Sequence, residues 1–182
     1  TESFGIKDLF SGLLNSFPVA SKAATHVVHC IQQFVGNRKV QTLYSDNAKE
    51  FIGSANELML ARDGGQPGVP HTNAMIERCN QLVIGGTSTC FIAAGLPPYC
   101  WSYGSPCFCF NLNTSIIHGC SPWERTHGAP LLHERFPFGS LVEFKPNEVR
   151  TTARKWAPNA EFGAFAGYRI CPGYKWRNEY LV

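Results

Sequence analysis

Three acidic side chains stand where carboxylates from different elements can share a metal ion. Asp8 ends one expected strand, Asp46 ends another just before a polar turn, and Glu77 lies on an expected helix beside Asn73 and Asn80. The carboxyl ends of strands in an α/β sheet open onto the functional crevice. Mg²⁺ prefers a few oxygen ligands with room left for water and phosphate. Two such ions activate a nucleophile and stabilise the leaving oxygen at phosphorus.

A simpler interpretation of the same residues needs no chemistry. Asp8 and Asp46 also fit ordinary turn positions, and Glu77 fits an exposed charge on a helix. Spacing alone favours this simpler interpretation, so the residues around the acids have to decide between the two.

The elements that position these acids follow from hydrophobic spacing and from glycine and proline. Strands are expected at residues 3–7, 13–19, 40–44, 141–144, 164–170 and 180–182. Helices are expected at residues 22–35, 54–61, 73–82, 87–94, 99–111 and 122–127. Gly85-Gly86 is expected to break or kink the chain between two of these helices, and residues 63–68 are expected to form a loop.

This order of elements predicts an α/β core followed by a small all-β segment that begins near residue 137. Residues 1–136 carry nine basic and nine acidic side chains, whereas residues 137–182 carry seven basic and four acidic ones. The net charge of +3 therefore lies entirely in the tail. A short basic tail behind a neutral body suggests contact with a polyanion, and a merely solvated tail is the alternative.

A long segment of the chain carries no charge. No Asp, Glu, Lys or Arg occurs among the 45 residues between Arg78 and Glu124, so this segment is expected to be buried in the fold or against a second copy of the chain. Six of the eight cysteines lie in it and are expected to pack as small apolar side chains. The Cys and His residues within 107–109 and 118–120 do not have the spacing of a zinc site.

Composition argues against several other classes of protein. An aromatic fraction of 13% argues against disorder. The sequence contains no uninterrupted run of about 18 apolar residues, so no membrane span is predicted. Charged residues Glu2, Lys7 and Asp8 fall within the first ten residues, so no secretory signal is predicted.

The residues around the three acids form sequence blocks that occur together in one family. Residues 44–51 read Tyr-Ser-Asp-Asn-Ala-Lys-Glu-Phe, residues 70–80 read Pro-His-Thr-Asn-Ala-Met-Ile-Glu-Arg-Cys-Asn, and residues 8–12 read Asp-Leu-Phe-Ser-Gly. These blocks resemble the three acidic blocks of retroelement integrases, and most closely those of copia-type retrotransposon polyproteins. Further segments match in the same order: residues 94–97, Trp101, Asn111, and residues 121–124, 138–140 and 165–168.

The resemblance implies a fold and a division into domains. It implies a ribonuclease-H-like integrase catalytic core, a mixed sheet flanked by helices, in residues 1–136. Residues 137–182 resemble the small SH3-like β-barrel, or part of one, that follows the core in such polyproteins.

The resemblance also implies an activity. Asp8, Asp46 and Glu77 fall on the Asp-Asp-Glu triad of the family, which binds two Mg²⁺ or Mn²⁺ ions with DNA present. The implied activity is DNA 3′-end processing and strand transfer, in which a water and then a 3′ hydroxyl attack a phosphodiester. The implied partners are the element's DNA ends, target DNA and further copies of the chain, with no membrane and no small-molecule cofactor. The implied location is a cytoplasmic particle and then the nucleus.

Seven polar residues are candidates for contact with nucleic acid: Lys49, His71, Asn73, Arg78, Asn80, Arg154 and Lys155. Each candidate has a structural alternative. Asn73 also fits a helix cap, and His71 also fits a solvent-facing loop. Lys49 and Arg78 suit phosphate contacts or exposed ion pairs. The last two cations directly precede Trp156, a combination that suits backbone contact with base stacking or a solvated linker.

Several functions therefore stay open. The first is a metal-dependent polynucleotidyl transferase of an integrase. The second is a decayed integrase fold that binds DNA or a partner without catalysis, a hypothesis that rests on the short first strand and on the 30 residues between Asp46 and Glu77, fewer than in the retroviral signature. The third is a ribonuclease-H-like nuclease without strand transfer, and a cysteine-based redox or zinc protein is the least favoured.

Overall fold

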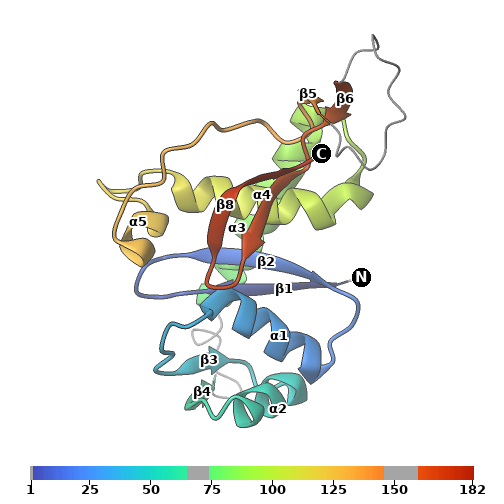
Figure 1. Ribbon diagram of the computed structural model, residues 1–182. Coiled ribbons are helices and arrows are strands. Elements are labelled where there is room, and N and C mark those ends of the chain that lie inside the picture. Colours follow the sequence, from blue (N-terminus) through green and yellow to red (C-terminus); the bar gives the residue numbers. More distant parts are fainter. Residues whose placement is uncertain (1, 65–73, 146–159) are drawn as a thin grey trace.

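The computed structural model describes residues 2–64, 74–145 and 160–182, and Figure 1 shows how its elements are arranged. The helices are α1 (Ala24–Val35), α2 (Lys49–Glu57), α3 (Ala74–Ala94), the short 3-10 helix η2 (Pro98–Cys100), α4 (Trp101–Thr114) and α5 (Pro122–His127). The strands are β1 (Glu2–Lys7), β2 (Leu14–Val19), β3 (Leu43–Ser45), β4 (Arg62–Gly64), β5 (Leu141–Phe144), β6 (Glu161–Ala164), β7 (Gly167–Cys171) and β8 (Lys175–Leu181).

An antiparallel hairpin of β1 and β2 lies between α1 and the helices α3 and α4 (Figure 1). Its register pairs Lys7 with Leu14 at the turn end. The turn is closed by two backbone hydrogen bonds, from the Asp8 N–H to the Leu13 carbonyl (2.8 Å) and from the Gly12 N–H to the Asp8 carbonyl (2.9 Å). The predicted hairpin is therefore confirmed, and its turn begins at Asp8.

Helix α1 confirms the predicted amphipathic pattern. Val27, Val28, Ile31 and Phe34 are buried on one face. The helix ends at Gly36, which has a φ of 59° and donates its N–H to the Gln32 carbonyl. Glycine adopts this backbone conformation without the steric cost that a Cβ would add.

Helix α3 runs unbroken through Gly85 and Gly86, so the chain has no break there, one of the two predicted alternatives. The reason lies in packing against α4. A Cβ on Gly86 would lie 2.1 Å from the ring of Phe108, so the glycine lets the two helices approach closely. Gly104 of α4 has a similar role against Phe91, whose ring would lie 2.8 Å from an added Cβ.

The segment between the second and third acids differs from its prediction. The helix expected at residues 54–61 lies earlier, at Lys49–Glu57, because it begins directly after the polar turn that follows β3. The loop expected at residues 63–68 begins inside strand β4, which pairs in parallel with β3. Residues 65–68 lie outside the described part of the chain. A short connecting helix and strand are therefore both present.

The strands form four two-stranded sheets. Among the described strands, the β1–β2 and β3–β4 pairs do not join into the expected single mixed sheet, since β3 and β4 pair over only three residues each. In the tail, the strand expected at residues 164–170 is divided into β6 and β7, which pair with different partners. The expected closed barrel is not formed by the strands that the structure describes. Overall, the architecture is a mixed α/β fold with small sheets.

The turn between β7 and β8 is inserted into the core. Tyr174 is fully buried, and its ring packs against Phe34 of α1 with a centroid distance of 5.9 Å. The Gly173 N–H donates to the Gln33 carbonyl (2.8 Å), and a Cβ on Gly36 would lie 2.6 Å from the Gly173 Cα. The domain boundary near residue 137 stays a prediction, and this hairpin is packed directly on the core elements.

The uncharged segment is only partly buried. Phe91, Cys107, Cys109 and Phe110 are buried in it, whereas exposed apolar side chains on the same segment include Ile84, Ile92 and Tyr99. The expected burial inside the fold is thus confirmed for much of α4, whereas α3 keeps several apolar side chains exposed. None of the helices in the described ranges is long and apolar enough to cross a membrane.

Candidate functional site

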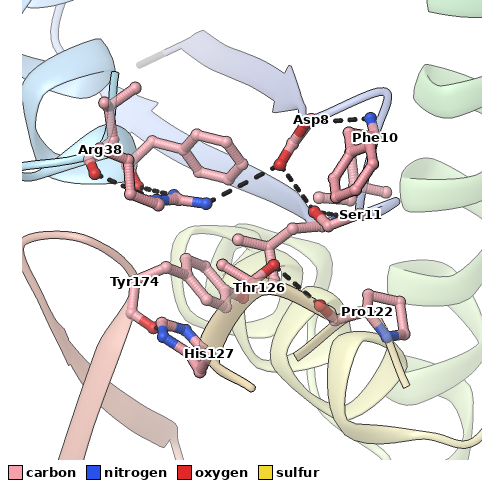
Figure 2. Close-up of polar contacts among 12 residues, drawn as sticks. Asp8, Phe10, Ser11, Arg38, Pro122, Thr126, His127 and Tyr174 are labelled. Carbon is pink, nitrogen blue, oxygen red and sulfur yellow. Dashed lines mark hydrogen bonds and ion pairs between the residues drawn. The ribbon is translucent and has the colours of Figure 1, made fainter. Parts of the chain in front are cut away.

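Asp8 stands immediately after β1, and local hydrogen bonds fix its carboxylate. Oδ1 accepts the backbone N–H of Phe10 (3.0 Å), and Oδ2 accepts the hydroxyl of Ser11 (2.7 Å). Ser11 is itself buried, and its hydroxyl oxygen accepts the Leu13 N–H (3.2 Å). The Asp8 side chain is therefore both the cap of a tight turn and a carboxylate held in one orientation (Figure 2).

A positive charge faces this carboxylate. One terminal nitrogen of Arg38 lies 3.8 Å from Asp8 Oδ2. The rest of the guanidinium is used at the end of α1, where it donates to the Val35 carbonyl (3.1 Å) and to the Phe34 carbonyl (2.5 Å). Burial lowers the pKa of Arg38, and Asp8 opposes that shift. An arginine stays charged in either case, so Asp8 has a permanent cation beside it.

His127 lies beside Tyr174, in the same part of the molecule as Arg38 and Asp8 (Figure 2). A ring nitrogen lies 3.1 Å from the Tyr174 carbonyl, and its ring packs on Trp123 at 4.3 Å. Burial lowers the pKa of His127, and the nearby charges of Arg38 and Lys175 lower it further against the opposing hydrogen bond to Tyr174. Protonation of His127 is therefore disfavoured in the folded chain.

Asp46 directly follows β3 and is exposed. Its Oδ1 accepts the Ala48 N–H (3.2 Å), so the side chain closes a tight turn just before α2. Its backbone carbonyl accepts from Arg62 of β4 (3.1 Å), which also donates to the side chain of Asn47. Among the hydrogen bonds that the structure describes, none involves the other carboxylate oxygen of Asp46, Oδ2.

Glu77 is exposed in the first turn of α3, a position where the helix dipole favours a negative charge. The described residues contain no group of three or more His, Cys, Asp or Glu side chains placed to hold one metal ion. Asp8, Asp46 and Glu77 all belong to the described residues. In this arrangement they therefore do not fit a shared metal site, and their catalytic role stays a prediction.

The candidates for nucleic-acid contact are divided between described and undescribed residues. Lys49 begins α2, and Arg78 and Asn80 are on α3, all three exposed. Arg78 lines a shallow pocket of about 410 Å³ together with Lys7 at the end of β1. The remaining four candidates lie outside the described ranges: His71, Asn73, Arg154 and Lys155.

A second and larger pocket, of about 620 Å³, is mainly apolar, and Asp8, Asp46 and Glu77 are not among its lining residues. Phe91 of α3, Trp101 of α4 and Ser16 of β2 are among its lining residues. Of the described residues that line it, none is charged. It therefore adds no acid, base or phosphate contact to the candidate site.

Sequence reasoning did not single out two residues that shape the site. Ser11 belongs to the sequence block of residues 8–12, but no role was predicted for its hydroxyl, which donates to Asp8. Arg38 was not assigned at all, and its signal in the sequence is weak: a basic residue just past the end of a helix that stops at Gly36. Such a residue is expected to contact the last helix carbonyls, but nothing local indicates that Asp8 lies beside it.

No protein-family model and no curated protein matches this chain. Among solved structures, the fold is similar to the catalytic core domain of BIV integrase. The identity is 19% and the TM-score is 0.49, and the similarity covers 67% of this chain and 89% of that one.

Proposed function

We propose that this chain is a catalytic core of a retroelement integrase of the copia type, which processes DNA 3′ ends and joins them to target DNA. The observation that carries the proposal is the placement of two acids from matching sequence blocks. Asp8 and Asp46 each directly follow a strand, and backbone N–H groups hold each carboxylate in place. Glu77, from the third block, is exposed on the first turn of α3.

The proposed cofactor is Mg²⁺ or Mn²⁺, bound with DNA at Asp8, Asp46 and Glu77. A divalent ion there would supply charge stabilisation at a phosphodiester. Because the described residues do not gather the three carboxylates, the proposal requires that they come closer when the ion and DNA bind. The local hydrogen bonds of Asp8 and Asp46 would then orient two of the three ligands.

The wider proposals rest on charge and on the sequence resemblance. We propose DNA ends and target DNA as partners, self-association, and action in the nucleus after a cytoplasmic particle stage. The tail is proposed to be an SH3-like segment, and its basic excess would face the DNA backbone. Lys49, Arg78 and Asn80 are the exposed described residues proposed to contact DNA.

A second candidate function is DNA binding without catalysis by a decayed integrase fold. A specific observation favours it: the carboxylate of Asp8 is engaged by Ser11 and faces Arg38. A nuclease without strand transfer is a third candidate, which differs from the first only in its products.

The experiment is Mn²⁺-dependent nicking and strand transfer on a labelled DNA duplex. Asp46→Asn and Glu77→Gln are expected to lose activity to background, because each removes one negative charge from the triad. Glu57→Gln is the matched control, since Glu57 is an exposed carboxylate at the end of α2. It is expected to retain activity.

The outcomes separate the candidates. Activity that survives in both triad variants contradicts the proposal. Salt-sensitive DNA binding with no cleavage in the folded wild-type chain supports the second candidate. Cleavage without joined products supports the nuclease.

A further inference from the structure

A pocket of about 620 Å³ is lined by residues of β1, β2, α3, η2 and α4. Its volume lies within the range of about 300–1,000 Å³ that is usual for small-molecule sites. Val83, Phe91, Leu96 and Trp101 supply apolar walls. Of the described residues that line the pocket, none has a charged side chain, so a charged group inside it would lose water without gaining a counter-charge. The pocket therefore suits an uncharged molecule.

Three serine hydroxyls that line this pocket form one hydrogen-bonded chain. Ser16 Oγ donates to Ser105 Oγ over 3.0 Å. A hydroxyl has one proton to donate, so Ser16 accepts in its 2.7 Å contact with Ser3, and Ser3 is the donor there. The chain of hydroxyls therefore runs from Ser3 on β1 through Ser16 on β2 to Ser105 on α4.

This chain of hydroxyls ends at a donor without an acceptor. Ser105 is buried and receives the proton of Ser16, and among the hydrogen bonds of the described residues its own proton has no acceptor. Thr87 of α3 lines the same pocket, and its buried Oγ1 has no partner within the described part of the chain. Buried polar groups in folded proteins nearly always have partners. An acceptor brought by a bound molecule would remove the cost of the unpaired Ser105 proton.

Exposed apolar side chains border the pocket. Ile84 and Ile92 line it, lie about two turns apart on α3, and are 67% and 83% exposed. Contact with the hydrocarbon part of a bound molecule would remove some of this surface from water, which favours binding. The pocket thus combines an apolar surface with one directed hydroxyl donor.

We propose that this pocket binds a small, uncharged, mainly apolar molecule that carries a carbonyl oxygen, and that Ser105 donates its hydroxyl proton to that oxygen. Ser3 and Ser16 fix the direction of the donor, because each hydroxyl of the chain passes its proton to the next one. Asp8, Asp46 and Glu77 are not among the lining residues, so the inference does not rest on the proposed function.

The test is a titration of the full chain with methyl heptyl ketone, followed by NMR of the backbone amides and the indole N–H of Trp101. The wild-type chain is expected to bind the ketone saturably, with the largest shift changes at residues that line the pocket. Ser105→Ala is expected to weaken this binding about five-fold, the factor that corresponds to a net hydrogen bond of about 1 kcal/mol.

A matched probe and a matched variant separate the hydrogen bond from the shape of the pocket. The probe is the methylidene analogue of the ketone, in which a CH₂ group replaces the carbonyl oxygen. Ser105→Ala is expected to leave its affinity within about two-fold of wild type, because the analogue accepts no hydrogen bond. The variant is Ser88→Ala. Ser88 also lines the pocket, but its hydroxyl already donates to the Ile84 carbonyl (2.9 Å), so the ketone affinity is expected to stay unchanged.

If Ser105→Ala does not fold by circular dichroism, the wild-type chain still decides. A hydrogen bond weakens the carbonyl bond, so the infrared stretching frequency of the bound ketone is expected to lie below its value in hexane. A frequency equal to that in hexane overturns the inference.

Three results with folded variants also overturn it: no saturable binding of the ketone by wild type, an equal effect of Ser105→Ala on both probes, or an equal loss in Ser88→Ala. Self-association that Ile92→Asp abolishes, without binding of either probe, assigns the pocket to a second copy of the chain and overturns it as well. Loss of DNA cleavage in the triad variants is a separate result, which leaves this inference standing.

Discussion

Replacement of Asn113 by alanine is expected to loosen the attachment of the tail hairpin to the core. Asn113 of α4 is fully buried. Its Oδ1 accepts the Leu14 N–H (3.0 Å), and its Nδ2 donates to the Leu14 carbonyl (2.6 Å) and to the Tyr174 hydroxyl (2.7 Å). One amide thus connects β2, α4 and the β7–β8 turn.

The magnitude follows from what alanine leaves behind. Asn113→Ala orphans the N–H and the carbonyl of Leu14, both on a buried residue, and the hydroxyl of Tyr174. Each buried polar group without a partner costs about 1–3 kcal/mol. We therefore expect the free energy of unfolding to fall by about 4 kcal/mol. Tyr174→Phe removes only one of the three bonds and is expected to cost about 1 kcal/mol.

The assay is urea unfolding followed by tryptophan fluorescence, with Asn56→Ala on the exposed face of α2 as the control. The control is expected to change stability by less than about 0.5 kcal/mol. The double variant of Asn113 and Tyr174 is expected to cost less than the sum of the single variants, because the two side chains share one bond. A loss below about 1.5 kcal/mol for Asn113→Ala, or full additivity, would refute the reasoning.

The remaining predictions concern helix packing and pH. Gly86→Ala is expected to destabilise the fold by about 2 kcal/mol, because the added Cβ would lie 2.1 Å from the Phe108 ring. Gly85 has open space around it, so Gly85→Ala is expected to stabilise α3 by about 0.5–1 kcal/mol. Thermal unfolding of the pair checks this, and equal effects would contradict it. Burial lowers the pKa of His127 and His133 in the folded chain, so the unfolded chain binds more protons and stability is expected to fall as pH drops below about 6.5. Urea unfolding at about pH 7.5 and about pH 5 should show a smaller loss when both histidines are glutamine; an unchanged loss would count against the assignment.

Local sequence patterns predict the elements whose neighbours are close in the chain. The hairpin of β1 and β2, the buried face of α1 and the bounds of α5 follow from alternation, from helical spacing and from the Ser121 cap. These signals suffice because a few adjacent residues supply the hydrogen bonds and the apolar face. They fail where a distant residue decides, as at Gly86, whose tolerance in a helix depends on Phe108 of another helix.

The same local patterns do not predict which strands pair to form a sheet. The strand expected at residues 164–170 begins at the last residue of β6, which pairs with β5, and ends within β7, which pairs with β8. Gly167, with a φ of 128°, stands where the pairing changes. Alternation of apolar residues indicates that a segment is extended, and it carries no information about which strand is the partner.

In the candidate site, too, some contacts join residues close in the sequence and others join residues far apart in it. The turn chemistry of Asp8 and Asp46 is local, since each side chain accepts an N–H two residues further along the chain. The charge beside Asp8 is not local, because Arg38 reaches it only when α1 packs on the hairpin and the Gly36 turn packs on Gly173. A sequence block therefore identifies the acids of this site, whereas the positive charge that faces Asp8 depends on a contact that the tail hairpin helps to build.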